Sequence, residues 1–93
     1  MEVFFTLRAR EELRIAMRWY ENQRPELGQQ FLKQIDKSIN SIVENPRIYT
    51  KQHLNFRRCV IKQFPFSIYY TIEQNQIIVH AVLDNRQDPR KRP

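Results

Sequence analysis

The spacing of hydrophobic residues changes halfway along the chain. In the first half, apolar side chains recur every three or four positions, which is typical of a helix with one buried side. This spacing predicts one helix from about Arg8 to Asn22 and another from Pro25 to the Asn45-Pro46 step, where the proline ends it. The buried sides carry Ala9, Leu13, Ala16, Met17 and Tyr20 in the first helix, and Leu27, Phe31, Ile35, Ile39 and Ile42 in the second. The connection is so short that the helices must form an antiparallel hairpin.

Runs with strand propensity flank the two helices. Glu2–Thr6 precedes them, and Phe56–Lys62, Phe66–Glu73 and Gln76–Leu83 follow them. We therefore expect an α+β fold in which an N-terminal strand and an antiparallel helical hairpin are followed by a three-stranded antiparallel meander. Residues 1–93 should form a single domain that ends in a basic, irregular tail at residues 84–93.

Alternation along the strands assigns their side chains to the two faces of the sheet. The middle strand places Phe66, Ile68, Tyr70 and Ile72 on one side, and Ser67, Tyr69, Thr71 and Glu73 on the other. The preceding strand alternates Cys59 and Ile61 with Arg58, Val60 and Lys62. We expect the helices to cover the first face and the second to be partly open.

Composition excludes several classes of site. The chain has 93 residues, and its 12% of aromatic residues is typical of a folded domain. The single glycine, Gly28, cannot form a glycine-rich phosphate loop, and the single cysteine, Cys59, cannot form an internal disulfide. Two isolated histidines add no metal-binding cluster. We therefore expect no cofactor, no metal and no membrane segment, and we expect the protein to be cytoplasmic.

The positive charge is concentrated in the second half of the chain. Residues 1–50 carry eight basic and seven acidic side chains, whereas residues 51–93 carry eight basic and three acidic ones. An excess of this kind suits an acidic partner, either protein or nucleic acid, and equally suits a solvated surface that aids solubility. Charge alone leaves these alternatives open.

No catalytic template is recognisable among the polar residues. No glycine flanks a serine in the way that a nucleophile turn requires. We interpret His53 as a loop residue, His80 as a satisfied sheet histidine, Trp19 as a packing residue and Cys59 as an inert buried thiol.

Basic side chains are the better candidates for function. Arg58 and Lys62 share one side of a predicted strand, and Arg86 follows the last strand, so we expect these three to converge on a concave surface. Such a trio can bind phosphate, stabilise developing charge on a phosphate, or hold acidic side chains of a protein. Arg57 and Arg90 extend this candidate binding surface. The alternative is that all of them are edge charges that discourage aggregation of the sheet.

Several short motifs, in this order, resemble the RelE/ParE toxin superfamily. They are the pair Arg57-Arg58, the step Phe64-Pro65-Phe66, the pair Tyr69-Tyr70, the strand Ile77–Leu83 and the ending Arg86-Gln87-Asp88-Pro89. The resemblance covers nearly the whole chain. It implies the toxin of a bacterial type II toxin–antitoxin system, which forms a hetero-oligomer with a cognate antitoxin protein encoded beside it.

The two branches of this superfamily act differently. RelE-like members are ribosome-dependent endoribonucleases that cut mRNA with basic residues, whereas ParE-like members inhibit DNA gyrase and block replication. This chain has Val60 where the RelE branch places a strand lysine and Ser67 where it places an arginine. The RelE tyrosine beyond the terminal arginine is missing too, so only Arg58 and Arg86 match that site.

The resemblance therefore favours the ParE branch, with gyrase as the target and with Arg57, Arg58, Lys62, Arg86 and Arg90 as target-binding residues. An alternative is a RelE-like nuclease that acts on mRNA in the ribosome with an atypical catalytic set of Arg58, Lys62 and Arg86. A third possibility is a family member that has lost toxicity and only engages its antitoxin.

Overall fold

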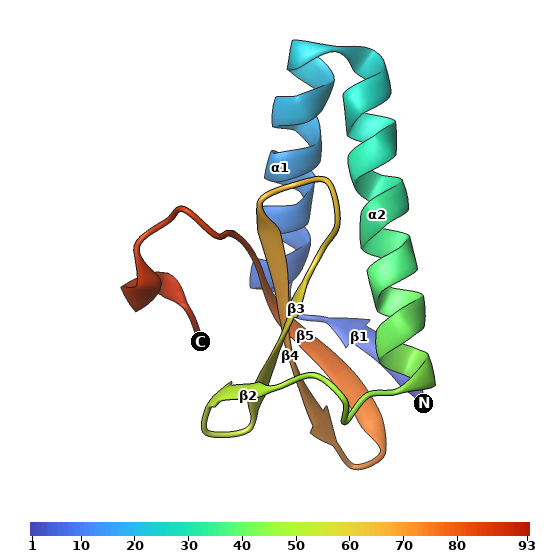
Figure 1. Cartoon of the computed structure of the whole chain (residues 1–93), viewed down its shortest axis with the longest axis vertical. Coiled ribbons are helices and arrows are strands. Elements are labelled where there is room, and N and C mark those ends of the chain that lie inside the picture. The colour runs from blue at the N-terminus through green and yellow to red at the C-terminus, as the bar shows by residue number, and fades with distance from the viewer.

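A helical hairpin packs on a five-stranded mixed sheet (Figure 1). The computed structural model describes all 93 residues. Its elements are β1 (Glu2–Phe5), α1 (Leu7–Gln23), α2 (Pro25–Glu44), β2 (Lys51–His53), β3 (Phe56–Val60), β4 (Phe66–Glu73), β5 (Gln76–Asp84) and a 3₁₀ turn at Pro89–Lys91. The strand order is β1-β5-β4-β3-β2, and only the β1–β5 pair is parallel. The predicted strand, hairpin and antiparallel meander are confirmed.

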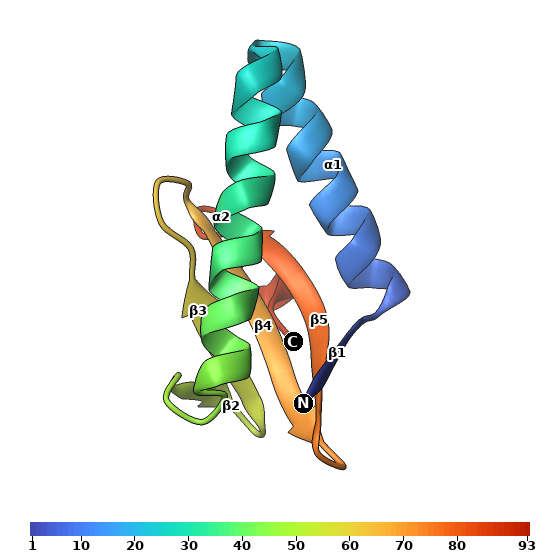
Figure 2. The same ribbon diagram turned by 90° about the vertical axis from the view of Figure 1, so that its right-hand side faces the viewer.

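Local chemistry sets the ends of the hairpin. Thr6 caps α1, because its Oγ1 accepts a hydrogen bond from the Ala9 N–H at 3.1 Å. Arg24 alone separates the helices, and Pro25 begins α2 where its missing N–H costs nothing. Gly28 then lets the helices approach closely, since a Cβ there would lie 3.0 Å from the Cβ of Glu21. Figure 2 shows α2 lying across the sheet while α1 diverges from it towards β5 and β1.

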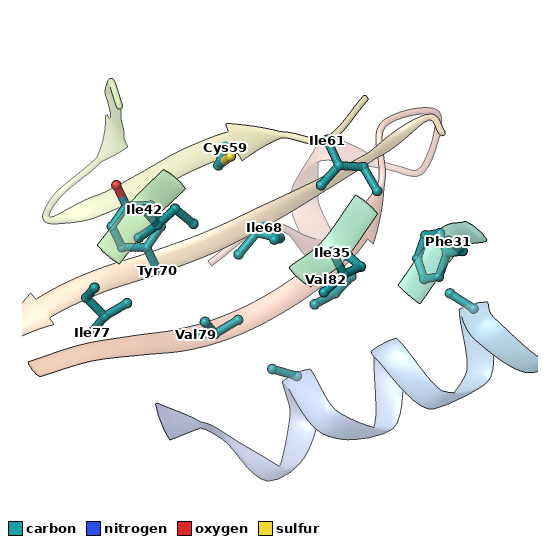
Figure 3. Close-up of a cluster of buried hydrophobic side chains, with 12 residues drawn as sticks. Phe31, Ile35, Ile42, Cys59, Ile61, Ile68, Tyr70, Ile77, Val79 and Val82 are labelled. Carbon is teal, nitrogen blue, oxygen red and sulfur yellow. The ribbon is translucent and has the colours of Figure 1, made fainter. Parts of the chain in front are cut away.

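The core lies between the hairpin and one face of the sheet (Figure 3). It contains the predicted helix positions Phe31, Ile35 and Ile42 together with Ile68 and Tyr70 of β4. The Tyr70 hydroxyl donates to the Pro46 carbonyl at 2.5 Å, so the loop after α2 is tied to the middle of the sheet. Burial raises the pKa of Tyr70 to about 12.

Two local predictions were wrong, and one sheet irregularity was not predicted. His53 is in β2, a short edge strand that its polar sequence did not indicate, rather than in a loop. The strand predicted to run to Lys62 ends at Val60, because Gln63 takes a left-handed backbone (φ 70°) that turns the chain towards β4. Tyr69 faces Ala81 while Tyr70 faces Val79, so His80 is the extra residue of a β-bulge.

The second face of the sheet is also covered. Ser67, Tyr69 and Thr71 are buried, although this face was expected to be partly open. Figure 1 shows the C-terminal segment, in red, on the side of the sheet away from α2. The tail is not wholly irregular: it forms its 3₁₀ turn, and Arg8 Nη2 donates to the Lys91 carbonyl at 2.6 Å. Neither helix combines the length and apolar character that a bilayer crossing requires.

Candidate target-binding surface

The five basic residues singled out from the sequence do not converge on one surface. Arg57 and Arg58 are adjacent in β3, and adjacent strand residues point to opposite faces. The Arg57 guanidinium turns to the loop after α2, where its Nη1 donates to the carbonyls of Arg47 at 3.0 Å and Tyr49 at 2.7 Å. Arg57 thus holds the connection between α2 and β2.

Arg58 lies on the face opposite the helices, within a cluster of neutral side chains. Its Nε donates to Ser67 Oγ and its Nη2 to Asn85 Oδ1, both at 3.0 Å. Ser67 Oγ in turn donates to Asn85 Oδ1 at 2.5 Å. The guanidinium carbon lies 5.9 Å from the centre of the Tyr69 ring, a cation–π distance. Arg58, Ser67, Tyr69 and Asn85 are called the Arg58 cluster below.

Lys62 lies in a different part of the molecule. It lines a polar groove of about 480 Å³ between α2 and β3, together with Lys37, Ser38 and Gln63. The alternation that would have kept Lys62 beside Arg58 ends at Val60, where the strand ends. The expected convergence of Arg58, Lys62 and Arg86 is therefore wrong.

Arg86 and Arg90 each form an ion pair with a nearby aspartate. Arg86 donates from Nε to Asp84 Oδ1 at 2.9 Å and from Nη2 to Asp84 Oδ2 at 2.6 Å. Its side chain is 71% exposed. Arg90 is bound in the same way by Asp88, with Nη2 at 2.6 Å, and is 90% exposed. The hydrogen bond from Arg86 lowers the pKa of Asp84, and that from Arg90 lowers the pKa of Asp88.

An apolar groove that was not predicted runs between α1 and the start of the C-terminal segment. It measures about 450 Å³, and its lining includes Ile15, Trp19, Leu83 and Arg86. Trp19 was expected to be a packing residue, yet it is 56% exposed, and Ile15 is 59% exposed. The helical spacing alone assigned neither residue to a groove, because the tail that forms its other wall is distant in sequence.

The remaining candidates have structural roles. Cys59 is buried as expected, and burial raises the pKa of its thiol, which disfavours the reactive thiolate. His80 Nε2 lies 2.8 Å from Thr71 Oγ1, and its ring meets Phe56 edge-on at 5.0 Å, so this sheet histidine is satisfied as expected. No cluster of His, Cys, Asp or Glu side chains could hold a metal ion.

Two solved structures share this fold. The chain resembles one from the "Chromosomal ParDE TA system from P. aeruginosa" with a TM-score of 0.76 and 17% identity, over 88% of this chain and 92% of that one. It resembles the isolated E. coli RelE toxin with a TM-score of 0.68 and 17% identity, over 95% of this chain and 87% of that one. No curated protein matches the sequence.

Family assignment comes from the sequence itself. The family model described as "ParE toxin of type II toxin-antitoxin system, parDE" matches residues 3–89, which is most of the chain. Membership in a type II toxin–antitoxin family implies an antitoxin partner. The motifs that resembled the RelE/ParE superfamily, the fold shared with both solved toxins and this match agree, and the chain belongs to the ParE toxin family.

Proposed function

We propose that this protein is a toxin that inhibits DNA gyrase by binding it and so blocks replication. The separation of its basic side chains is the observation that carries this proposal. Arg58 binds Asn85, the neighbour of Arg86, on the face away from α2, whereas Lys62 lines the groove beside α2 and lies apart from both. A toxin that acts by binding does not require these groups to meet.

A nuclease would require its catalytic side chains to lie around one phosphate. Cleavage by attack of a 2′-hydroxyl needs a base, a group that stabilises charge on the phosphate and an acid for the leaving oxygen, all within reach of one phosphate. Arginine side chains are poor bases in general, so neither Arg58 nor Arg86 supplies the base. The RelE-like alternative therefore lacks support from the arrangement of these residues.

The exposed guanidinium groups near the C-terminus are suited to binding. Arg86 and Arg90 are held in fixed orientations by Asp84 and Asp88, which reduces the entropy lost when a partner engages them. We place the target contact on this segment and on Arg58, and we assign Arg57 and Lys62 no part in it, because they lie elsewhere.

The groove beside α1 suits the antitoxin. Most of its lining residues are apolar, as in grooves that bind amphipathic segments, and Arg86 and Lys91 also lie among them. An amphipathic antitoxin segment that carries acidic residues would match both its apolar and its basic parts.

One experiment separates the two activities. The purified protein is added to a gyrase supercoiling assay and, in parallel, to ribosomes programmed with mRNA. We expect inhibited supercoiling and intact message. Cleaved message with normal supercoiling would refute the proposal, and an Arg86→Ala protein serves as the matched control in both assays.

A further inference from the structure

Arg58 is a part-buried cation that the protein holds in place without neutralising it. Its side chain takes part in none of the ion pairs of the molecule. Its partners are a hydroxyl, a carboxamide oxygen and an aromatic ring, all uncharged. Withdrawing a charge from water without a counter-ion is unfavourable, so a fold that fixes such a charge presents it to a ligand.

The free donors of the Arg58 cluster indicate the chemistry of that ligand. Asn85 Oδ1 accepts hydrogen bonds from both Ser67 and Arg58, which orients the amide and leaves its Nδ2 without a partner in the chain. Arg58 Nη1 makes no hydrogen bond either. The Asn85 backbone N–H donates to the Pro65 carbonyl at 2.7 Å, which fixes the backbone that carries the Asn85 side chain. A cation beside neutral N–H donors is a site for an oxyanion.

We propose that the Arg58 cluster binds a single carboxylate side chain of a protein partner. This inference rests on the proposed function in one respect, since it gives a ligand to one of the residues assigned there to the target contact. A planar guanidinium pairs with a planar carboxylate through two parallel hydrogen bonds, and here the guanidinium is already oriented.

The surroundings favour a carboxylate over the phosphates of a nucleic acid. A nucleic-acid backbone is held by several free cations in series. The nearest basic residues along the tail, Arg86 and Arg90, are each already paired with a carboxylate. A phosphate chain would need further free cations beside Arg58, whereas one acidic side chain needs only one.

The test is to supply the carboxylate from within the chain by the variant Asn85→Asp. Asn85 Oδ1 already lies 3.0 Å from Arg58 Nη2, so an aspartate there forms the ion pair without moving the backbone. We expect the melting temperature to be kept or raised and partner affinity to fall about tenfold or more. Asn55→Asp, in the exposed β2–β3 turn, adds the same charge as a control and should keep wild-type affinity. Arg58→Lys provides a second variant, which keeps the charge but loses the oriented fork.

Affinity is measured for two proteins, namely the antitoxin encoded beside this chain and purified DNA gyrase. A loss confined to one of them assigns the carboxylate to that protein. Wild-type affinity of folded Asn85→Asp and Arg58→Lys proteins for both partners would overturn the proposal, and a loss of RNA binding alone would overturn it in favour of phosphate. If the wild-type protein leaves gyrase unaffected, the proposed function fails while the antitoxin measurement still tests the site.

Discussion

Arg86 donates two hydrogen bonds to the Asp84 carboxylate, from Nε to Oδ1 at 2.9 Å and from Nη2 to Oδ2 at 2.6 Å. The same carboxylate accepts the Arg86 backbone N–H at 2.8 Å, so one aspartate fixes both the main chain and the side chain where β5 ends. Asp84 and Asp88 lie two residues before and two residues after Arg86. Asp84 pairs with Arg86, and Asp88 instead pairs with Arg90.

Arg86→Ala should abolish or sharply reduce growth arrest while leaving the fold intact. The side chain is 71% exposed and packs against little, so we expect the melting temperature to change by no more than ~4 °C. Toxicity on induction and thermal melting are measured side by side. Lys62→Ala, which removes an exposed cation elsewhere, should remain toxic. Full growth arrest by folded Arg86→Ala would remove Arg86 from the site.

Stability at low pH should depend on Asp84. Its pKa lies below the ordinary 3.8, chiefly because the Arg86 side chain donates hydrogen bonds to it, although partial burial opposes the shift. A lowered pKa means that the unfolded chain takes up the proton first as pH falls. The contribution is therefore complete well above pH 3.8 and is lost as pH falls through the lower folded value.

Asp84→Asn removes this contribution at every pH. Wild type should be more stable than the variant at pH 7, and the difference should shrink at pH 3. Urea unfolding midpoints at the two pH values measure it. A constant difference between pH 7 and pH 3 would show that the carboxylate charge contributes nothing.

Tyr70→Phe should destabilise the protein by ~1 kcal/mol, because it removes the donor to the Pro46 carbonyl without changing the packed ring. A loss of this size lowers the melting temperature by ~4–8 °C in a domain of this length. The tyrosine pKa is raised to about 12 by burial, so its contribution is present below the ordinary value of 10.0 and is lost as pH rises from there towards 12.

The gap between wild type and Tyr70→Phe should therefore narrow above pH 10, as urea unfolding at neutral and alkaline pH would report. Tyr49 and Tyr20 also have raised pKa values, but both are unchanged in the variant and cancel in the comparison. Equal unfolding midpoints for the two proteins at pH 7 would contradict a role for the Tyr70–Pro46 bond.

The parts of the fold that sequence predicted well are those with a strong hydrophobic period. The buried sides of α1 and α2 were read correctly, and so was the core-facing side of β4. The sequence Lys51–His53 carries no such pattern, because β2 is an exposed edge strand held only by its pairing with β3. β2 forms because a turn returns the chain to β3, and the hydrophobic pattern of the sequence does not report such a turn.

The sequence singled out candidate residues, whereas their surroundings could be described only from the structure. Arg58 was singled out, yet its partners Ser67 and Asn85 were not. Such contacts depend on strand register. Arg58 of β3 lies opposite Tyr69 of β4, and Ser67 of β4 lies opposite Leu83 of β5. Residues of β3, β4 and the end of β5 therefore come together. Lys62 was misplaced because strand alternation was extended past Val60, where the left-handed turn at Gln63 takes over.

Trp19→Ala should weaken the antitoxin complex while hardly changing the stability of the toxin alone. The indole is 56% exposed and lines the groove beside α1, where the proposed antitoxin segment would cover it. Exposed tryptophans in such grooves are frequent binding hot spots, and we expect dissociation to speed up about tenfold or more. Leu54→Ala, at an apolar residue that is 73% exposed on the β2–β3 turn, should leave dissociation unchanged.

Association with the antitoxin should slow as salt concentration rises. The second half of the chain carries eight basic and three acidic side chains, and such an excess speeds the encounter with an acidic partner over distances that salt screens. Dissociation breaks contacts already formed, in which apolar burial does not depend on screening, so it should change less. Binding kinetics at ~50 mM and ~500 mM NaCl measure both rates, since the Debye length falls severalfold between them. The Trp19→Ala protein should show the same salt dependence of association as wild type, because the indole carries no charge. Equal association rates at the two salt concentrations would show that the basic half of the chain does not steer the antitoxin.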